Sequence, residues 1–299
     1  MGASVKRARS EATVSSRHRS ATGVATRSAP NVTTRALSGA IGIEVTGVDL
    51  SEHVDGGVFA LLKEAFLASN GVVVFPGQFL TPGELTDFGA RWGELVVNPY
   101  LAEKHGFPGS PAALHVENVG KAKTPTERWH CDWMFLERPP SITIASAQVL
   151  PPFGGDTMWA NQYLAYERLS PGMKQMLDRL RGVFPGSQVS AVSGETEEFL
   201  GLHPIVRTHP ETGRKSLLLG HPGDSLLSFE DMTPEESRPL LELLYHHATT
   251  PDLIYRHHWQ PGDLVMWDNR CTLHYAVHDF GDDVPRTLAR VTLGCEPID

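Results

Sequence analysis

The stretch QPGDLVMWDNRCTLH, residues 260–274, contains two short strands around a polar turn. A Pro-Gly turn signal at 261–262 precedes an apolar run at 264–267, which is typical of a buried strand. The strand after the polar turn carries His274. Other strand-like runs occupy residues 141–150, 204–208, 216–219, 253–258 and 287–293. Because short strands dominate, the sequence predicts an α+β protein with a β-sandwich or barrel core.

A few helices are expected among these strands. Apolar residues at helical spacing over 54–69 predict one helix. The sequence TPGE at 81–84 places a threonine N-cap, a proline and a glutamate at a helix start, and SP at 170–171 and TP at 233–234 repeat this signal. Residues 39–50 predict a strand pair and residues 72–75 a buried strand. We find no internal repeat or interior linker, so residues 37–299 are expected to form a single domain.

Charge divides the chain into a tail and a body. Residues 1–36 contain seven basic residues and one acid, which leaves 19 of the 26 basic and 34 of the 35 acidic residues for the body. A body with a net charge of −15 is repelled by phosphate backbones, so nucleic acid is not an expected partner. The tail is rich in Ser, Thr, Ala and Arg, and we expect residues 1–36 to be disordered. An organelle transit peptide has a similar composition and is the alternative.

Composition also restricts the environment in which the protein works. Forty per cent of the residues are hydrophobic, which is enough for a sizeable core, yet no apolar run is long enough to cross a membrane. The three cysteines have no CxxC spacing. This pattern argues against a disulfide framework and favours a reducing compartment, so a cytoplasmic location is expected.

The sequence RWHCDWMF, residues 128–135, is the first candidate for chemistry. Residues i and i+2 of a strand lie on the same face, so His130 and Asp132 are expected to place an imidazole beside a carboxylate. Zn²⁺, Fe²⁺ or Mn²⁺ can bind both groups. A third ligand must come from far along the chain, where the strand with His274 is available. Adjacent histidines such as His257 and His258 point to opposite faces of a strand and cannot share an ion.

Two arginines four residues apart, Arg286 and Arg290, follow in an apolar strand. On a regular strand they share a face, and the strand is expected to be buried. Two buried like charges are costly unless anions neutralise them. Either they pair with internal carboxylates, or they bind carboxylates of ligands by bidentate contacts.

Four motifs in chain order resemble those of one enzyme family. They are WHxD at 129–132, GGDT at 154–157, HPxVxTHPxTG at 203–213 and WDNRxxxH at 267–274. The combination is similar to the taurine dioxygenase and 2,4-dichlorophenoxyacetate dioxygenase family, over roughly residue 37 to the C-terminus. The resemblance implies a double-stranded β-helix, or jelly roll, flanked by helices. It also implies an oxidoreductase that uses Fe(II), 2-oxoglutarate and O₂ and releases succinate and CO₂.

The resemblance assigns roles to individual residues. It implies that His130, Asp132 and His274 are the iron ligands, which leave three coordination positions open. It also implies that Thr157 and Arg286 hold the distal carboxylate of 2-oxoglutarate, although the loop between His274 and Arg286 is one residue longer than in taurine dioxygenase. Halogenating members of the family replace the carboxylate ligand with a small residue. Asp132 therefore implies hydroxylation or a related oxidation.

The substrate is expected to be a small organic acid that is more apolar than taurine. Arg290 matches an arginine that meets the acidic group of the substrate in sulfonate-oxidising relatives. Asn98 stands where the taurine enzyme has a histidine, Leu101 replaces a tyrosine, and Trp133 replaces the small apolar residue after the aspartate ligand. Asn98 and Trp133 are therefore expected to contact the substrate, with Trp133 as a pocket wall; plain packing is the alternative. These changes argue against taurine itself. In the alternative, Arg290 pairs with an internal carboxylate such as Asp224 and the substrate is neutral.

Two functions from other classes remain open on the sequence. A zinc-dependent hydrolase could use the same two histidines and aspartate, but it would not explain the arginine pair. A non-catalytic, cupin-like protein that binds a metal or an organic acid would retain both features. A homo-oligomer is compatible with the sequence, which does not decide the matter.

Overall fold

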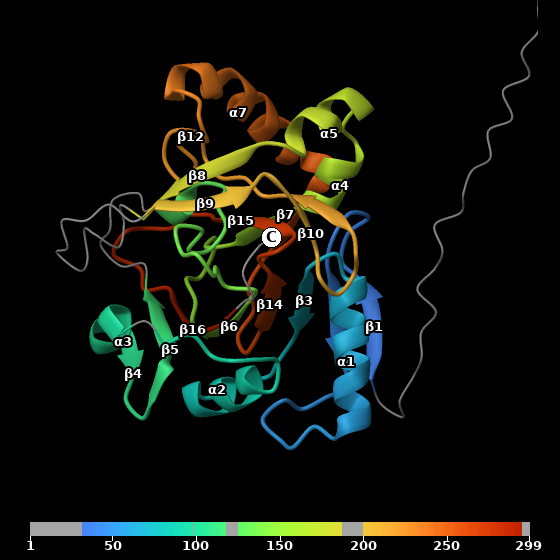
Figure 1. Ribbon diagram of the computed structural model, residues 1–299. Helices are drawn as coiled ribbons and strands as arrows, with labels where there is room; N and C mark the ends of the chain where they lie inside the picture. Colours follow the sequence, from blue (N-terminus) through green and yellow to red (C-terminus); the bar gives the residue numbers. More distant parts are fainter. Residues whose placement is uncertain (1–31, 98, 118–124, 187–199, 295–299) are drawn as a thin grey trace, which may run out of the picture.

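An eight-stranded sheet forms the larger layer of the computed structural model, which describes residues 32–97, 99–117, 125–186 and 200–294. Its strands follow the order β1-β2-β3-β14-β6-β16-β5-β4 (Figure 1). In that order the bounds are Thr33–Ala36, Ile43–Thr46, Val72–Phe75, Leu264–Asp268, Ile142–Val149, Thr287–Leu293, Ser110–Glu117 and Gly106–Phe107. The central strand β14 is buried along its whole length, as the apolar run at 264–267 predicts.

A smaller sheet of three strands faces the large one. Its order is β13-β7-β15, with bounds Ile254–His257, Thr157–Asn161 and Thr272–Ala276. Trp159 of β7 is fully buried and its ring lies 5.6 Å from that of Trp267 on β14, so the two sheets are in direct contact. Two stacked sheets of this kind, flanked by helices, are the predicted α+β jelly roll.

The remaining strands form two small sheets near one end of the molecule. One has the order β12-β8-β9, and the other pairs β10 with β11. Their bounds are Ser228–Phe229, Arg181–Pro185, Leu200–Pro204, Val206–Thr208 and Lys215–Leu217. Short 3₁₀ turns occupy Pro125–Glu127 and Pro251–Leu253.

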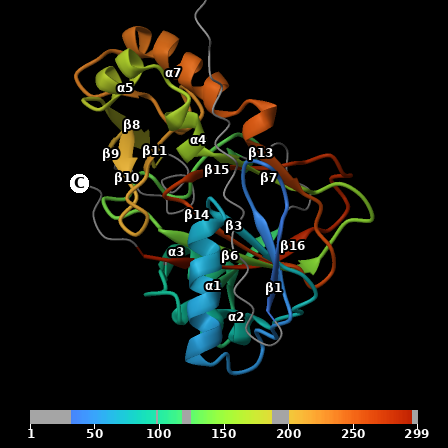
Figure 2. The same ribbon diagram turned by 90° about the vertical axis from the view of Figure 1, so that its right-hand side faces the viewer.

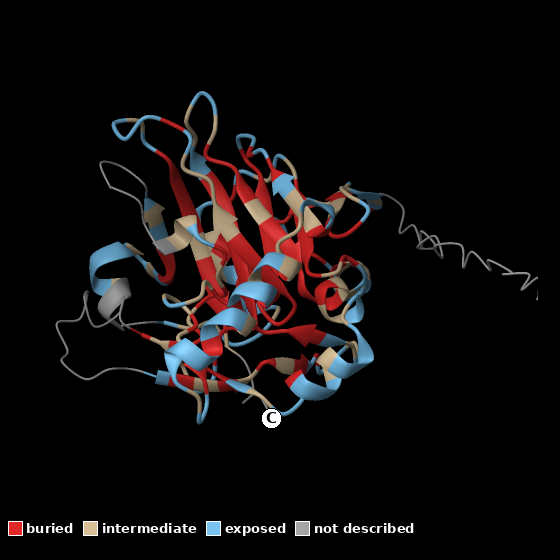
Figure 3. Cartoon of the chain, turned by 90° about the horizontal axis from the view of Figure 1, so that it is seen from above, coloured by how far each residue is buried: buried red, intermediate tan, exposed pale blue. Residues whose placement is uncertain are grey.

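Helices cover the two ends of this framework (Figures 1 and 2). Their bounds are α1 Gly56–Ala68, α2 Pro82–Ala90, α3 Pro99–His105, α4 Gln162–Glu167, α5 Pro171–Leu177 and α7 Pro234–Ala248. Leu62 of α1 and Phe88 of α2 share a core with strand β3 of the large sheet. Leu241 and Leu244 of α7 belong to a second core with Leu177 of α5. The strands are largely buried and the outer faces of the helices exposed (Figure 3).

The predicted helix starts are confirmed. Thr81 caps α2 and Thr233 caps α7, each in a capping box with the glutamate three residues later. Ser170 caps α5 through the backbone N–H of Met173. Among the described residues, no helix is long and apolar enough to cross a membrane.

The predicted boundary between tail and body is wrong. Strand β1 covers Thr33–Ala36, inside the stretch assigned to a disordered tail, and pairs with β2 in an antiparallel hairpin. Two cross-strand contacts stabilise this pairing: the Thr33 and Thr46 hydroxyls lie 2.8 Å apart, and Arg35 forms an ion pair with Glu44 at 2.9 Å. The count of basic residues therefore included one that belongs to the sheet. Residues 1–31 lie outside the described part of the chain.

Candidate active site

The segment with His130 and Asp132 is not the regular strand that the sequence predicts. His130 makes a single antiparallel bridge with His274, in which each backbone N–H donates to the other carbonyl at 3.0 and 2.9 Å. The chain then turns at Asp132, and Trp133 adopts a left-handed φ of 46°. The bridge places His130 beside His274, and the turn brings Asp132 to the same point. The two expected neighbours therefore meet, but through a turn rather than strand alternation.

The three predicted ligands converge at one point. A ligand atom from each of His130, Asp132 and His274 lies within 4.8 Å of the others. Asp132 and His274 are only 5% and 6% exposed, and the two imidazole rings are 4.0 Å apart. His130 Nδ1 lies 2.7 Å from the carbonyl oxygen of Arg128, so Nδ1 carries the proton and Nε2 keeps its lone pair for a metal.

Protonation in this cluster suits a metal site. Burial, helped by the nearby His130, lowers the pKa of His274 to about 3, and burial also lowers the pKa of His130. Burial alone would raise the pKa of Asp132, but Arg290 and the two histidines outweigh it and lower this pKa to about 2. Two neutral imidazoles and one carboxylate are the donors that a non-haem Fe(II) site requires, so these residues fit the ion.

Arg286 lies in a second polar site beside strand β7. Its side chain is 3% exposed, and its Nε donates to the carbonyl oxygen of Gly155 at 2.8 Å. Burial lowers the pKa of the guanidinium to about 10, against the opposing effect of Asp156. Among the described residues, no carboxylate forms an ion pair with Arg286, so its charge is available for a bound anion.

Thr157 completes this second site. A guanidinium nitrogen of Arg286 lies 3.4 Å from Thr157 Oγ1, and the indole N–H of Trp259 donates to the same oxygen at 3.0 Å. Both contacts use the oxygen as acceptor, so the hydroxyl hydrogen is free to donate to a ligand. Gly155 is required here, because its φ is 69° and a Cβ would lie 2.9 Å from Arg286 Cδ.

Arg290 lies at the metal cluster rather than with Arg286. Its Nη1 is 3.2 Å from Asp132 Oδ1, and its guanidinium carbon is 5.6 Å from the centre of the Trp133 ring. Arg286 precedes β16, and a register shift occurs between Thr287 and Leu288, so simple strand alternation does not describe the pair.

The other predicted residues around the substrate have mixed outcomes. Asp224, the proposed internal partner of Arg290, instead forms an ion pair with Arg128 at 2.9 Å. Trp133 lies in the turn after Asp132 and is partly buried against Arg290. Asn98 lies outside the described residues, as does the side chain of Leu101.

Two contacts of the metal cluster were not predicted from the sequence. The hydroxyl of Thr143 donates to Asp132 Oδ2 at 2.8 Å, and the side-chain amide of Asn269 donates to Thr143 Oγ1 at 2.9 Å. Thr143 carries no signal, since it lies eleven residues after Asp132 in an ordinary strand. Asn269 stands in the WDNR motif, which could have marked it, although the motif does not say what the amide contacts.

The jelly roll places two imidazoles and a carboxylate at one point, beside a buried arginine suited to an organic acid. This arrangement fits a metal-dependent oxygenase with an acidic cosubstrate. Comparison with known proteins identifies the family. Residues 33–292 match the family described as "Taurine catabolism dioxygenase TauD, TfdA family". The chain belongs to this family.

Individual relatives are similar over most of their length. The chain is 34% identical to an alkylsulfatase of Acinetobacter baylyi, over 88% of this chain and 84% of the relative. It is also 34% identical to an (S)-phenoxypropionate/alpha-ketoglutarate-dioxygenase of Sphingobium herbicidovorans, over 81% and 88% of the two chains. Among solved structures, a taurine dioxygenase from Burkholderia xenovorans superposes with a TM-score of 0.77 at 37% identity, covering 89% of this chain and 92% of that one.

The protein is therefore a 2-oxoglutarate-dependent dioxygenase that uses Fe(II) and O₂. The prediction of an oxidoreductase on a jelly-roll fold is confirmed. The zinc hydrolase and the non-catalytic cupin-like protein are set aside, because neither agrees with membership of a dioxygenase family.

Proposed function

We propose that this dioxygenase oxidises a small anionic organic molecule at a carbon close to the metal. In this proposal His130, Asp132 and His274 hold the iron, and Arg286 and Thr157 hold the distal carboxylate of 2-oxoglutarate. The convergence of the three ligand atoms within 4.8 Å and the unpaired charge of Arg286 support these roles. Bound there, Fe(II) would supply, with O₂ and 2-oxoglutarate, the oxidising chemistry of the reaction, and 2-oxoglutarate would be converted to succinate and CO₂.

The protein contributes positioning and charge to this reaction. Arg286, just before β16, and the Thr157 hydroxyl of β7 would fix the far end of the cosubstrate by hydrogen-bond donors from two separate segments. His130 keeps its orientation through the Arg128 carbonyl, so its ring does not need to reorient when the ion binds. The burial of Asp132 and His274 excludes bulk water from their side of the cluster.

The observation that best supports an anionic substrate is the position of Arg290. Its Nη1 lies 3.2 Å from the carboxylate of Asp132, a proposed iron ligand, and its Nε is buried with no hydrogen-bond partner among the described residues. A buried donor without a partner is costly, and an anionic group of a substrate beside the iron would satisfy it. Trp133, against the same guanidinium, would form an apolar wall for the organic part of the substrate.

The relatives favour two substrate classes. One is named an alkylsulfatase and another a phenoxypropionate dioxygenase, so a sulfate ester or an aryloxyalkanoate combines the anionic group and the apolar body that the site would bind. We place taurine below both, because Asn98 and Leu101 stand where the taurine enzyme has a histidine and a tyrosine. The proposed reaction is hydroxylation of the carbon next to the ether or ester oxygen.

A panel of paired substrates tests this proposal. Succinate formation is measured with 2-oxoglutarate, Fe(II) and either an alkyl sulfate, an aryloxyalkanoate, taurine, or the methyl ester of the aryloxyalkanoate. We expect turnover with one of the first two, little with taurine, and a large preference for the free acid over its ester. The preference should disappear in Arg290→Ala. Equal turnover of the acid and its ester by the native protein would contradict an anionic anchor.

We also infer that the protein works in the cytoplasm as one domain. Cys131 and Cys271 are both buried and free, which agrees with a reducing compartment. Subcellular fractionation tests the location, and the coincidence of thermal unfolding by two probes tests the single domain. Whether copies associate is open to measurement by light scattering.

A further inference from the structure

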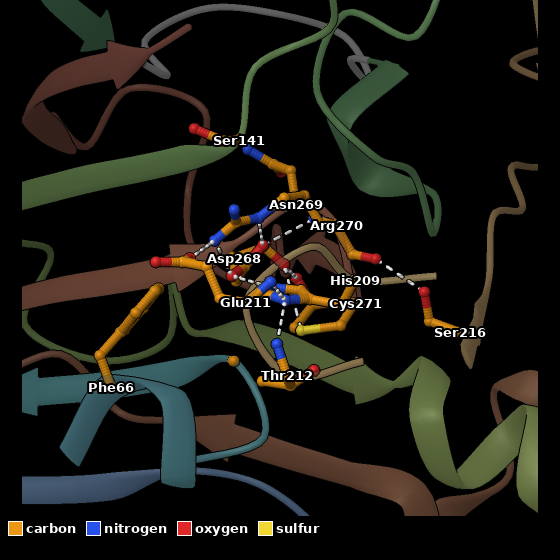
Figure 4. Close-up of polar contacts among 12 residues, drawn as sticks. Phe66, Ser141, His209, Glu211, Thr212, Ser216, Asp268, Asn269, Arg270 and Cys271 are labelled. Carbon is orange, nitrogen blue, oxygen red and sulfur yellow. Dashed lines mark hydrogen bonds and ion pairs between the residues drawn. The ribbon is translucent and has the colours of Figure 1, made fainter. Parts of the chain in front are cut away.

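The last residue of β14 and the turn that leads to β15, residues 268–271, are buried and held by several polar contacts. All four residues are at most 8% exposed. Asp268 accepts from the Arg270 side chain at 2.9 and 2.7 Å, and Glu211 contacts the same guanidinium at 2.9 Å (Figure 4). The Ser216 hydroxyl donates to the carbonyl oxygen of Arg270 at 2.8 Å. The turn is therefore fixed through both its side chains and its backbone.

One side chain of this rigid turn reaches toward the metal cluster. Asn269 is fully buried, and its Nδ2 donates to Thr143 Oγ1 at 2.9 Å. Thr143, also fully buried, donates to Asp132 Oδ2 at 2.8 Å. The order of donors is fixed, because an amide N–H can only donate. The threonine oxygen must then accept from Asn269, and its single hydrogen is directed to Asp132.

The backbone of the same residue contacts the ligand segment a second time. The thiol of Cys131, which stands between the two ligands of the HxD sequence, donates to the carbonyl oxygen of Asn269 at 3.0 Å. A guanidinium nitrogen of the buried Arg207 donates to this carbonyl as well. Asn269 thus holds the segment of His130 and Asp132 at two points, while the strand after the turn carries His274.

We propose that Asn269 and Thr143 are positioning residues for the carboxylate ligand. Their relay holds Oδ2 of Asp132, which leaves Oδ1 on the side of His274, whose Nε2 lies 3.8 Å away. A carboxylate that is held through one oxygen presents the other to the ion in a single orientation, so less rotational freedom is lost when the metal binds. This inference rests on the proposed role of Asp132 as an iron ligand.

Binding of Mn(II) to the metal-free, full-length protein tests the inference without turnover. Dissociation constants are measured by calorimetry for the native protein and for Thr143→Val, Thr143→Ser and Asn269→Asp, with the melting temperature of each recorded. Valine keeps the shape of threonine without the hydroxyl. Aspartate at 269 replaces the donating amide with an acceptor, so the one hydrogen of Thr143 is contested by two carboxylates.

We expect Thr143→Val and Asn269→Asp to bind Mn(II) about 10- to 100-fold more weakly, which is the usual cost of losing a partner of a metal ligand. Thr143→Ser should restore affinity to within about 3-fold, because it keeps the donor. Ser146→Ala is the matched control. It removes another buried hydroxyl of β6, which accepts a hydrogen bond from the side-chain amide of Gln148 at 3.2 Å, and should leave Mn(II) affinity unchanged. If Thr143→Val does not fold, Thr143→Ala tests the loss of the same hydrogen bond to Asp132.

Asp132→Ala separates the two ways in which the inference can fail. If Asp132→Ala loses Mn(II) binding while folded Thr143 and Asn269 variants bind as tightly as the native protein, the positioning role is wrong and the metal site stands. If Asp132→Ala binds Mn(II) as tightly as the native protein, the proposed ligand set is wrong, and the positioning role with it. A lower melting temperature with unchanged Mn(II) affinity would mean that the relay only stabilises the fold.

Discussion

Two largely buried groups in this protein are both built from histidine, aspartate and arginine, with one histidine in the first and two in the second, but they differ in how these side chains are paired. In one, Asp268 accepts from Arg270 and from His209, whose Nε2 lies 3.0 Å away (Figure 4). His209 Nδ1 in turn accepts two backbone N–H groups, from Glu211 and Thr212. No buried side-chain nitrogen or oxygen of His209, Asp268 or Arg270 lacks a hydrogen-bond partner, so the group forms a closed structural cluster.

The other group is left open. His274 Nδ1 and Arg290 Nε are buried without a hydrogen-bond partner among the described residues, and Asp132 Oδ1 is contacted by Arg290 alone in the hydrogen-bond network. Residue type therefore does not distinguish a functional cluster from a structural one here. The two groups differ instead in unsatisfied hydrogen-bonding capacity, which a bound ligand or ion would supply. Trp159 Nε1 and Gln162 Oε1 are also buried without a partner among the described residues, so this capacity indicates a functional site only together with the three candidate metal ligands.

The largest effect is expected at the open cluster, in activity. His130→Ala, Asp132→Ala and His274→Ala should each abolish iron-dependent succinate formation, since each removes one of the three proposed ligands. Their melting temperatures should fall by less than that of a variant of the closed cluster. Coupled assays and thermal unfolding measure both quantities. Near-native activity in any one variant would remove that residue from the ligand set.

At the closed cluster we expect the larger effect in stability rather than in activity. Arg270→Met leaves the buried carboxylate of Asp268 without its main partner, and should lower the free energy of unfolding by about 3–5 kcal/mol. Arg238→Met is the control, because Arg238 and Glu242 form an exposed pair at 4.0 Å that is worth at most about 0.5 kcal/mol. Urea unfolding measures both. Equal losses in the free energy of unfolding would show that burial does not determine how much an ion pair contributes to stability.

Arg286 and Arg290 should differ in which of the two substrates they affect. Arg286→Ala should raise the KM for 2-oxoglutarate, because it removes a buried cation beside Thr157. The loss is expected at about 2–5 kcal/mol, on the order of 30- to several-thousand-fold. Arg290→Ala should mainly impair use of the primary substrate. Steady-state kinetics with each substrate varied separate the effects, and an exchange of the two phenotypes would reverse the assignment.

The residues of the metal cluster could be predicted from sequence, because the three proposed ligands belong to motifs that resemble those of one family. His130, Asp132 and His274 do converge, although the HxD sequence lies on a turn rather than a strand. The contacts that orient them could not be predicted. Asn269 and Thr143 are 126 residues apart and meet only because β14 pairs with β6. For the same reason sequence could not tell the closed cluster from the open one.

The closed cluster should also determine part of the acid sensitivity. Burial alone would raise the pKa of Asp268, but Arg270 and His209 outweigh it and hold this pKa below its usual range. A lowered folded-state pKa contributes stability above the unfolded value of about 4 that is lost as the pH falls further. The stability advantage of the native protein over Asp268→Asn should therefore be constant between about pH 5 and 7 and shrink below about pH 4.

Denaturant unfolding at a series of pH values measures this advantage. Asp283→Asn, at an exposed aspartate of a loop, is the control and should differ little from the native protein at any pH. An advantage that grows as the pH falls would mean that the Asp268 carboxyl is stabilised in its protonated form, which is the opposite of the expected sign.

The smallest effect is expected at the N-terminus, where the sequence boundary and the structural boundary differ. Removal of residues 1–31 should leave activity and melting temperature essentially unchanged, since their composition offers no apolar stripe to pack on the body. Removal of residues 1–36 also deletes β1, an edge strand with one exposed ion pair to Glu44. That loss should cost about 1 kcal/mol, or roughly 2–4 °C in melting temperature. Thermal unfolding of both truncations decides between the two boundaries. Equal melting temperatures of the two truncations would place the start of the stable domain at Leu37 after all. A loss of several degrees on removing residues 1–31 alone would show that the basic segment packs against the body.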